Sequence, residues 1–402
     1  MGDWIRMLFR GRPGWMSALM LFCAFMAFLY LPWDFFWKPV AVDEEVWFGI
    51  MFTGWAAKVA EPFHWVVYAA GAYGFYRMRP WMWPWAAVYV AQIAVGMLVW
   101  SVVERAGAAG WTMGMVSAAA FTGLAALLWR ARPRFQPHHR SLRDRYGEWA
   151  LVTGASAGIG EAFAHALARE GLSCVLTARR AGRLETLASE LEREHGVSTR
   201  VIAADLADPA GADAVADTVA DLELAFLVNN AGVGYSGRFD KQDVERLRRM
   251  VQLNCVAPVV LTGRLLPAMC ERGRGAIVIV GSIAGRQPLP LHGVYSATKA
   301  FDLLFGESIS TELRGRGIDV LVLEPGATAT EFQEMAGEIA HPGESAEDVV
   351  RVALDALGRQ PSVVSGWFNW ARANAATRLL PRPLLALIAR DVVARGTPRE
   401  MR

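Results

Sequence analysis

Three features that often reveal function are missing from this sequence. The 402 residues carry a net charge of only +2, so no overall field attracts nucleic acid, and we expect no nucleic-acid partner. The four cysteines show no paired spacing, which argues against a disulfide framework and favours a role in packing. Up to Trp129 there is one histidine, His64, too few for paired haem ligands or a di-iron cluster, so we expect no metal and no second redox centre. The cysteines are Cys23, Cys174, Cys255 and Cys270.

Hydrophobic residues are abundant and unevenly distributed. They make up 53% of the chain, and the mean hydropathy of +0.23 is high for a soluble protein. Long apolar stretches continue to about Trp129, and the sequence from Arg130 onward is that of an ordinary globular protein. The basic, proline-containing segment Arg130–Tyr146 lies between them. We predict a transmembrane helical domain over 1–130, a basic linker over 131–147, a folded domain over 148–365 and an amphipathic segment over 366–402.

Four apolar stretches are long enough for a helix to cross a hydrocarbon layer of about 30 Å. Tryptophans near their ends suit the membrane interface. The second stretch is the least defined, because Val46–Tyr76 is too long for one simple span. A cleaved signal peptide is the alternative for the first stretch, but Leu29–Trp33 offers bulky residues where small ones are needed. The predicted spans are Trp15–Trp33, Trp55–Tyr76, Trp81–Val103 and Trp111–Trp129.

The charged residues that flank these stretches alternate in sign. Cytoplasmic loops of membrane proteins accumulate Lys and Arg. Arginines precede the first stretch, separate the second from the third and follow the fourth, whereas the other two connections are acidic or nearly neutral. The pattern predicts a cytoplasmic amino terminus and a cytoplasmic domain after the fourth span. The residues are Arg6, Arg10, Arg12, Arg77, Arg79, Arg130, Arg132, Arg134 and Arg140 on one side, and Asp43, Glu44, Glu45, Glu104 and Arg105 on the other.

The second stretch contains three ionisable residues at helical spacing. Lys58, Glu61 and His64 would lie along one face of a helix. Ionisable residues inside a membrane are costly enough to suggest a function. If the helix begins later, however, Lys58 and Glu61 are only interfacial. Both interpretations remain open from the sequence.

From Trp149 onward, short β-rich runs alternate with longer amphipathic segments. This alternation predicts right-handed crossovers and a parallel sheet covered by helices on both faces, with ligands at the carboxyl ends of the strands. The predicted fold class is an α/β Rossmann-type doubly wound parallel sheet, preceded by an all-α transmembrane domain of about four helices. The candidate strands are Trp149–Thr153, Cys174–Ala178, Arg200–Ala203, Ala225–Asn229, Ala276–Gly281 and Ile318–Leu323.

The glycine-rich run TGASAGIG lies between the first candidate strand and the next helix. Gly154, Gly158 and Gly160 allow a tight turn and a close approach to a pyrophosphate, which the amino terminus of the helix then faces. Alone, such a run is common in ordinary strand-to-helix turns. Its weight comes from the motifs that follow it.

Further motifs occur in order between Trp149 and Thr330. Together they resemble the short-chain dehydrogenase/reductase family. The phrases RYGEWALVTGAS and GVYSATKAFDLLFGESISTEL are most similar to its branch of membrane-associated 3-ketoacyl-CoA and 17-beta-hydroxysteroid reductases. The resemblance implies a catalytic oxidoreductase domain over 148–365 and a homo-oligomer formed through helices. It implies a catalytic tetrad of Asn254, Ser282, Tyr295 and Lys299. It implies cofactor contacts from Thr153, Gly154, Ser156, Gly158, Ile159, Gly160, Asp205, Leu206, Asn230, Ala231, Gly232, Tyr295, Lys299, Pro325, Gly326 and Thr328, with Asn229 in a strand-stabilising motif.

The chemistry of ketone reduction explains why these residue types are needed. A proton must reach the developing alkoxide. Tyrosine has a pKa of about 10, which a nearby ammonium lowers, and Lys299 lies four residues after Tyr295 on one helix face. Ser282 would orient the substrate carbonyl. The resemblance adds that Lys299 holds the nicotinamide ribose and that Asn254 holds a relay water. Singly, such residues are usually surface or turn residues.

Two arginines follow the second candidate strand, where an acidic residue would bind the ribose of NAD. Arg179 and Arg180 suit the 2′-phosphate of NADP instead, because a guanidinium matches phosphate geometry. We therefore predict NADPH/NADP as the cofactor, with NAD the lesser alternative. Two exposed arginines that start a helix would be the structural explanation.

Two segments near the carboxyl end bear on the substrate. Met335–Ser345 is predicted to form a mobile cover over the nicotinamide. Gly366–Arg395 mixes aromatic and aliphatic residues with arginines, which suits a membrane surface, an apolar substrate entrance or an ordinary capping helix. With the apolar spans, this favours membrane lipids as partners and a lipophilic carbonyl substrate. A redox sensor that signals through the membrane part, or a small transporter with an attached reductase, are the alternatives.

Overall fold

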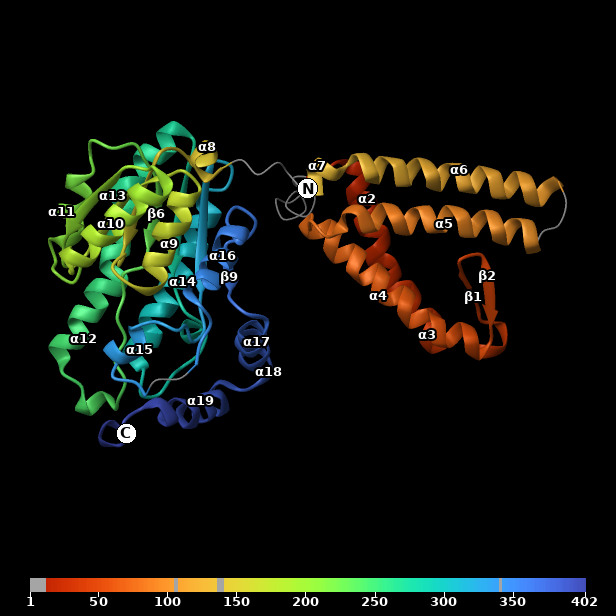
Figure 1. Cartoon of the computed structure of the whole chain (residues 1–402). Coiled ribbons are helices and arrows are strands. Elements are labelled where there is room, and N and C mark those ends of the chain that lie inside the picture. Colours follow the sequence, from red (N-terminus) through yellow and green to blue (C-terminus); the bar gives the residue numbers. More distant parts are fainter. Residues whose placement is uncertain (1–11, 105–107, 136–140, 340–341) are drawn as a thin grey trace. The chain divides into compact units, whose positions relative to one another are not determined.

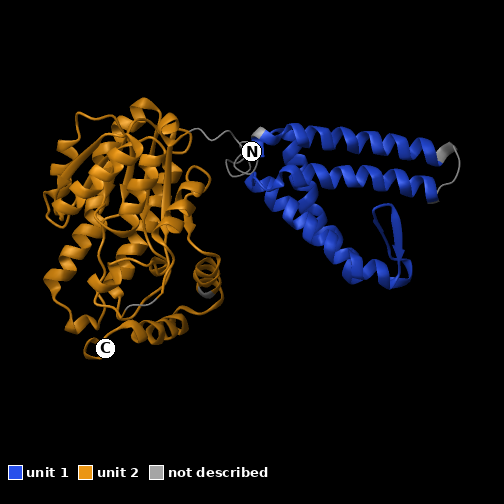
Figure 2. Ribbon diagram, viewed as in Figure 1, with its two compact units in different colours: residues 1–139 blue, residues 140–402 orange. Residues whose placement is uncertain are grey.

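The chain forms two separate compact units (Figure 2). The computed structural model describes residues 12–104, 108–135, 141–339 and 342–402. Unit 1 comprises residues 1–139 and unit 2 comprises residues 140–402. Each unit has its own hydrophobic core, one cluster in unit 1 and two in unit 2.

Unit 1 is built from long apolar helices (Figure 1), and a helix forms at each of the four predicted stretches. The first helical stretch contains a wider π turn at Met26–Tyr30. Pro32, just after it, has no amide hydrogen with which to continue the regular α-helical pattern. Three predicted cytoplasmic arginines, Arg6, Arg10 and Arg140, lie outside the described residues, as does Arg105 of the opposite side. The helices are α2 (Gly14–Phe25), η1 (Met26–Tyr30), α3 (Leu31–Trp37), η2 (Val40–Val42), α4 (Trp55–Arg77), α5 (Met82–Glu104), α6 (Ala108–Arg130) and α7 (Arg132–Phe135).

Length and composition allow four helices of the described residues to cross a membrane. They are Gly14–Trp37, Met82–Val103, Gly110–Arg130 and Val244–Arg272. The last belongs to unit 2, where Leu261 and Met269 are buried in the core of that unit. Helix α4 is outside this set and carries Lys58, Glu61 and Pro62 in its first half. Large apolar side chains lie exposed on unit 1, which suits a surface that faces lipid.

The loop after α3 contains a hairpin that the sequence analysis did not predict. Strands β1 (Glu44–Trp47) and β2 (Ile50–Thr53) pair antiparallel around Phe48 and Gly49, whose φ angles are 52° and 85°. Glycine tolerates such angles, so Gly49 between two short β-rich runs is the signal that was overlooked. The hairpin contacts α4, because the ring of Trp47 stacks on that of His64 at 3.8 Å between centroids and Glu45 bonds His64.

Five charged residues, which we term the ionic cluster, join α3, the following loop and α4. The Lys58 ammonium lies 3.0 Å from Asp43 Oδ2 and 3.5 Å from Glu61 Oε2. Lys38 Nζ lies 3.1 Å from Asp34 Oδ1 and 2.9 Å from Asp43 Oδ1. Helix α4 begins at Trp55, so Lys58 and Glu61 lie in its first two turns, and both are buried.

Unit 2 contains a seven-stranded parallel sheet, which confirms the predicted Rossmann-type fold (Figure 1). The strand order is β5-β4-β3-β6-β7-β8-β9. From β3 the next strands are added on one side, as β4 and β5, and from β6 onward they are added on the other side. This reversal of strand order opens a crevice at the carboxyl ends of β3 and β6. The six predicted strands are present, and β9 was missed. The strands are β3 (Trp149–Thr153), β4 (Ser173–Ala178), β5 (Thr199–Ala203), β6 (Leu224–Asn229), β7 (Gly275–Val280), β8 (Ile318–Glu324) and β9 (Ser362–Val364).

Helices cover both faces of this sheet. Successive residues of a strand point to opposite faces, so Ala150 and Val152 pack in one core cluster and Leu151 in the other. The first face carries α9 (Gly158–Arg169), α10 (Ala181–His195) and α16 (Ala346–Ala356). The second carries α11 (Gly211–Thr218), α13 (Ala257–Arg272) and α14 (Gly293–Glu312), and the shorter preceding elements are η3 (Phe239–Lys241), α12 (Val244–Val251), η4 (Gln252–Val256) and η5 (Ile283–Arg286).

Both ends of unit 2 are fastened to its core. Helix α8 (Leu142–Tyr146) lies within the predicted basic linker, residues 131–147. Its residues Leu142 and Tyr146 are nevertheless buried, and the Tyr146 hydroxyl donates to Asp319 of β8 at 2.8 Å. The carboxyl-terminal helices follow β9. They are α17 (Trp367–Ala371), η6 (Arg372–Ala376), α18 (Thr377–Leu379), α19 (Arg382–Gly396) and η7 (Arg399–Met401). The short helix α15 (Phe332–Met335) precedes α16.

Candidate active site

A cavity of about 940 Å³ opens at the carboxyl ends of the central strands. Its walls come from the turns after β3 to β8 and from α19. Most of the residues predicted for the site line it. Three do not: Thr153, Gly160 and Asn254. The described part of the predicted cover, Met335–Ser345, contributes Met335, Glu338 and Ile339, whereas residues 340–341 lie outside the described residues.

The glycine-rich turn closes tightly beneath the cavity. Gly154 and Gly158 have φ angles of 66° and 60°, which residues with a Cβ rarely adopt. A Cβ on Gly158 would lie 2.8 Å from Thr330 Cγ2. The amino terminus of α9 begins at Gly158 and lines the cavity, so its free amide groups favour a phosphate there. This turn fits the pyrophosphate of a dinucleotide.

Thr153 and Gly160 support this turn from below. The Thr153 hydroxyl accepts from the amides of Asn230 and Ala231, each at 2.9 Å, and donates to Val228 O at 3.1 Å. Its side chain is buried with its bonding capacity used. A Cβ on Gly160 would lie 2.3 Å from Gly154 O, so this glycine permits close packing of helix and strand. Both residues therefore hold the shape of the turn without lining the cavity, and their predicted cofactor contact stays a prediction.

Asn230 also holds the turn, although it lines the cavity. Its side-chain nitrogen Nδ2 donates to Thr153 O at 2.8 Å and to Gly154 O at 3.3 Å. Its neighbour Asn229 donates to Thr262 Oγ1 at 3.1 Å, deep in the unit. Ala231 and Gly232 continue along the cavity wall without side chains that would fill it. These bonds fix the β6 end against the β3 end, where the crevice lies.

Charged residues gather where β4 and β5 end. Arg179 and Arg180 line the cavity, and Arg180 Nε donates to Ser156 Oγ at 3.1 Å. Arg180 Nη1 also lies 2.7 Å from Glu331 Oε2, and Arg183 lies 2.6 Å from the other oxygen of Glu331. The sequence analysis did not single out Glu331.

The adenine-side contact predicted for Asp205 and Leu206 lies on the same wall. Asp205 Oδ1 accepts from Ala207 N at 2.9 Å, and Oδ2 lies 2.6 Å from Arg249 Nη2. Both carboxylate oxygens are therefore engaged by the protein, and Leu206 is buried beside them. Ile159 lines the cavity from the first turn of α9.

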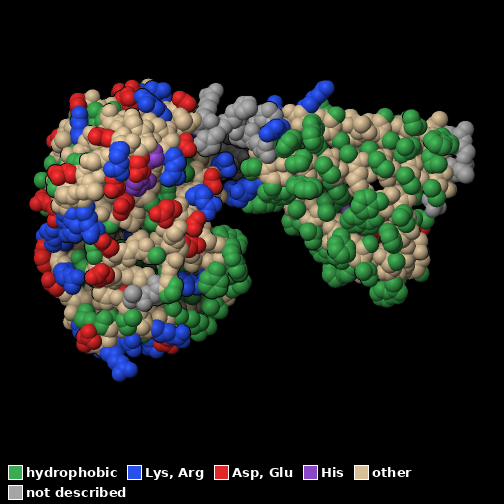
Figure 3. All heavy atoms as spheres, viewed as in Figure 1, with side chains coloured by type: hydrophobic (Ala, Val, Ile, Leu, Met, Phe, Trp, Pro, Cys, Tyr) green, Lys and Arg blue, Asp and Glu red, His purple; other side chains and the backbone are tan. Residues whose placement is uncertain are grey.

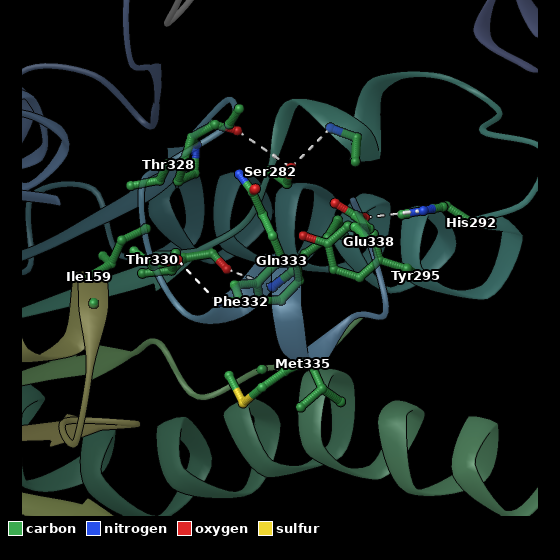
Figure 4. Close-up of a pocket in the computed structure, with 18 of the residues that line it drawn as sticks. Ile159, Ser282, His292, Tyr295, Thr328, Thr330, Phe332, Gln333, Met335 and Glu338 are labelled. Atoms are coloured by element: carbon green, nitrogen blue, oxygen red, sulfur yellow. Dashed lines mark hydrogen bonds and ion pairs between the residues drawn. The ribbon is translucent and has the colours of Figure 1, made fainter. Parts of the chain in front are cut away.

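Tyr295 and Lys299 lie one turn apart on α14 and both line the cavity. Ser282 caps η5, where its hydroxyl accepts from Ala284 N at 3.2 Å and donates to Pro325 O at 3.4 Å. Figure 4 shows Tyr295 beside His292, Glu338 and Phe332. Burial raises the pKa of Tyr295, while Lys299 and Ser282 act in the opposite direction. The expected influence of Lys299 is present, but the net pKa is above the ordinary value, because desolvation disfavours the phenolate.

Lys299 is held by an aspartate that the sequence analysis missed. Its ammonium donates to Val280 O at 2.8 Å and lies 3.0 Å from Asp302 Oδ2. Burial disfavours the charged lysine, but Asp302 and Tyr295 outweigh this effect and raise the pKa of Lys299. Lys299 therefore stays protonated. An acid three residues after a helical lysine was the available signal.

Asn254 lies behind the catalytic face in the π turn η4. Its Oδ1 accepts from Val233 N at 3.0 Å, and its Nδ2 donates to Val233 O at 2.9 Å and to Thr298 Oγ1 at 3.0 Å. The side chain is buried and does not line the cavity. The side-chain amide therefore positions the loop after β6 and α14, and the relay water expected at Asn254 stays a prediction.

A buried ion pair fastens the loop after β8. Glu324 receives Arg286 in a bidentate pair, with both N–O distances 2.6 Å, and is fully buried. Arg286 Nη1 also donates to Asn374 Oδ1 of η6 at 3.2 Å. Pro325, Gly326 and Thr328 follow directly and line the cavity. The pair therefore ties this loop to the carboxyl-terminal helices.

The remaining wall of the cavity is mostly apolar. Phe332 lies 5.6 Å from the Tyr295 ring between centroids, and Met335 lies in the same helix, α15. His292 Nε2 is 3.2 Å from Glu338 Oε1, and burial lowers the pKa of His292 to about 4. Helix α19 closes this side with Leu385, Ile388, Ala389, Val392 and Val393.

Known proteins match this chain in sequence and in fold. The family described as short chain dehydrogenase matches residues 148–339. A human very-long-chain 3-oxoacyl-CoA reductase is 34% identical over 239 residues, which cover 58% of this chain and 76% of the relative. The chain belongs to the short-chain dehydrogenase family. As a short-chain dehydrogenase it is an oxidoreductase that acts on CH–OH and C=O groups and binds NAD(P).

Other short-chain dehydrogenases match as well. The 7beta-hydroxysteroid dehydrogenase of Collinsella aerofaciens is 31% identical over 241 residues, which cover 57% of this chain and 90% of the relative. A solved structure of a 7beta-hydroxysteroid dehydrogenase has a TM-score of 0.59 and 29% identity, over 62% of this chain and 99% of that one. The short-chain dehydrogenase of Sphingobium yanoikuyae in complex with NADPH has a TM-score of 0.53 and 35% identity, over 57% and 91%.

Proposed function

We propose that this protein is a membrane-bound, NADPH-dependent reductase of a ketone on a lipophilic substrate. The substrate classes that fit are a 3-oxoacyl thioester, a steroid-like ketone or a long-chain ketone. The observation that carries this proposal is the placement of Tyr295, Lys299 and Ser282 on one cavity with the glycine-rich turn and an apolar wall from α19.

Each catalytic side chain has a task in the proposed reaction. Tyr295 donates its phenolic proton to the developing alkoxide, with Ser282 bonded to the same oxygen to orient it. Lys299, kept protonated by its neighbours, stabilises the phenolate that remains and would bind the nicotinamide ribose. When bound, NADPH supplies the hydride. Pro325, Gly326 and Thr328 would border the nicotinamide.

The preference for NADPH rests on the arginines after β4. Arg179 and Arg180 line the cavity, and a guanidinium pairs with a 2′-phosphate, whereas the free hydroxyl of NAD offers it less. Ser156 and Glu331 already hold the Arg180 guanidinium in place. In the cell, this preference favours the direction of reduction.

The lipophilic substrate is inferred from two features of the chain. Apolar side chains of α15 and α19 line the side of the cavity that faces Tyr295. The helices of unit 1 are long and apolar enough to anchor the protein in a membrane. The names of the relatives agree with this class, since they refer to very-long-chain 3-oxoacyl-CoA and to a hydroxysteroid. The arginine pattern of the sequence favours a cytoplasmic active site. Formation of a homo-oligomer stays a prediction.

The decisive experiment combines a substrate screen with one substitution. Purified full-length protein is assayed for NADPH oxidation with chain-length series of 3-oxoacyl thioesters, steroid ketones and simple ketones. In Tyr295→Phe we expect turnover to fall about a thousandfold, because the general acid is lost, while NADPH binding persists. Tyr235→Phe is the matched control, since Tyr235 does not line the cavity. Near-normal turnover by Tyr295→Phe would refute the proposed mechanism.

A further inference from the structure

The segment Gly366–Arg395 carries an exposed apolar surface, which we term the carboxyl-terminal surface. Trp367 and Leu379 are 80% and 79% exposed, far more than soluble proteins usually allow for such residues. Figure 3 shows hydrophobic side chains gathered over α17 and α18, with basic side chains beside them along α19. The surface consists of Trp367, Phe368, Trp370, Leu379, Leu384, Leu387, Ile388 and Val392.

Positive charge is interspersed with these apolar residues. The segment contains five arginines, all exposed, and a single acidic residue, Asp391. Asp391 pairs with Arg390 at 3.1 Å. Within the described part of the chain, no ion pair is formed by the other four arginines. The arginines are Arg372, Arg378, Arg382, Arg390 and Arg395.

The same segment forms a wall of the active-site cavity. On α19, Leu385 and Ala389 are buried and line the cavity, whereas Ile388 and Val392 line it and are also about half exposed. The cavity therefore opens next to the carboxyl-terminal surface. Hydrogen bonds fix the segment to the rest of unit 2. Arg286 donates to Asn374 Oδ1, and Asn369 Nδ2 donates to Ser365 O at 3.1 Å.

We propose that the carboxyl-terminal surface docks onto a lipid bilayer with anionic headgroups, so that a lipophilic substrate enters the cavity past α19 directly from the membrane. This inference rests on the proposed function for the identity of the substrate. Tryptophan and arginine are the residues that suit the boundary between acyl chains and headgroups. The unpaired arginines complement anionic lipids, which attract each basic residue near the surface.

A second copy of the chain fits this surface less well. In a two-fold contact the same patch meets itself, so the five arginines of one protomer would face those of the other with one acidic residue on each side. A bilayer avoids this repulsion. The apolar helices of unit 1 also tether unit 2 near a membrane, which raises its effective concentration there.

Unit 2 alone provides the experiment. Its cores are its own, and the 7beta-hydroxysteroid dehydrogenase structure matches 62% of this chain over 99% of its own length. Residues 140–402 are mixed with vesicles of phosphatidylcholine alone or of equal parts phosphatidylcholine and phosphatidylglycerol, and binding is measured by flotation. We expect binding to the anionic vesicles and weaker binding to the neutral ones. No binding of this wild-type fragment to anionic vesicles would overturn the proposal without any variant.

Variants then separate the two components of docking. Arg378→Gln with Arg382→Gln should weaken binding to anionic vesicles about 25-fold, or about fivefold for each charge. Trp367→Glu with Leu379→Glu should abolish binding to both vesicle types. None of these four residues lines the cavity, so turnover of a short soluble ketone should be unchanged, whereas the apparent KM for a vesicle-borne ketone should rise.

Val244→Glu is the matched control, because Val244 is 73% exposed on α12 and outside the segment. Equal loss of binding in this control would overturn the proposal. So would a dimeric fragment that Trp367→Glu converts to monomer, since the surface would then be an interface between copies. Vesicle binding needs no turnover. A fragment that binds vesicles but reduces no lipophilic ketone would therefore refute the proposed function and leave the docking surface in place.

Discussion

The two units bury charge in different surroundings. In unit 1 the ionic cluster places Lys58 between Asp43 and Glu61, with carboxylates on both sides of the ammonium. In unit 2 the Lys299–Asp302 pair is equally buried, but Lys299 also lines a cavity of about 940 Å³. The two lysines of the first set are each paired with carboxylates of the same set. The second retains a face on which another molecule can bind.

This difference suggests separate consequences for stability and for reactivity. Charges enclosed by protein satisfy one another, and removal of one partner leaves an uncompensated buried ion. Charges that border a cavity act on whatever binds there. We therefore expect substitutions in the ionic cluster to change the stability of unit 1 without changing catalysis, and substitutions along the cavity to do the reverse.

The largest effect is expected for Lys58→Met. Loss of the ammonium leaves buried carboxylates together, so we expect unit 1 to lose about 3–5 kcal/mol of stability. Unfolding in detergent can be followed by tryptophan fluorescence, and turnover of a soluble ketone should be unchanged. Arg77→Gln, exposed on the same helix, is the control. Addition of Asp43→Leu should recover part of the loss. A stable Lys58→Met protein with altered turnover would contradict the comparison.

A smaller effect is expected for Arg180→Ala, and we expect it to change only the preference for NADPH over NADH. A charge-assisted hydrogen bond contributes about 1.5–3 kcal/mol, so the ratio of kcat/KM for NADPH over NADH should fall about 10- to 100-fold. Thermal stability should change little, because Arg180 is partly exposed. Arg193→Ala, near the other end of the helix α10 that follows Arg180, is the control. An unchanged ratio would remove Arg180 as the phosphate ligand.

The smallest effect is expected for Asp302→Asn, and its signature is a pH profile. The negative charge of Asp302 raises the pKa of Tyr295, so its removal should lower that pKa. Reduction needs the protonated phenol, so the pH above which reduction fails should move down. Alcohol oxidation, which needs the phenolate, should extend to lower pH by a similar amount. Glu312→Gln, at the exposed end of α14, should leave both profiles unchanged, and a loss of stability without a moved profile would indicate a structural role only.

The regular parts of the fold could be predicted from the sequence because their patterns are local. Six strands of the sheet are found within a residue of their predicted limits, since their buried runs are long and follow turn residues. Strand β9 has only three residues, Ser362–Val364, too few to show a pattern. The β1–β2 hairpin was hidden because it follows an apolar helix and contains Trp47 and Phe48, which continue the same composition.

The site could be predicted only where spacing carries the information. Tyr295 and Lys299 are four residues apart, and the glycine-rich turn is contiguous, so both were visible. Glu331 lies 151 residues from Arg180, and Glu324 lies 38 residues from Arg286, so no local pattern links them. The supporting roles of Thr153 and Gly160 depend on which side of the turn faces the cavity, and that is fixed by tertiary packing.

The ion pair at the end of β8 has a mechanical consequence. Arg286 makes two bonds to Glu324 and a third to Asn374, so this one side chain links the end of β8, where the loop from Pro325 begins, to the helix η6. We therefore expect a displacement of η6 to be transmitted through Arg286 to the loop that starts at Pro325 and lines the cavity.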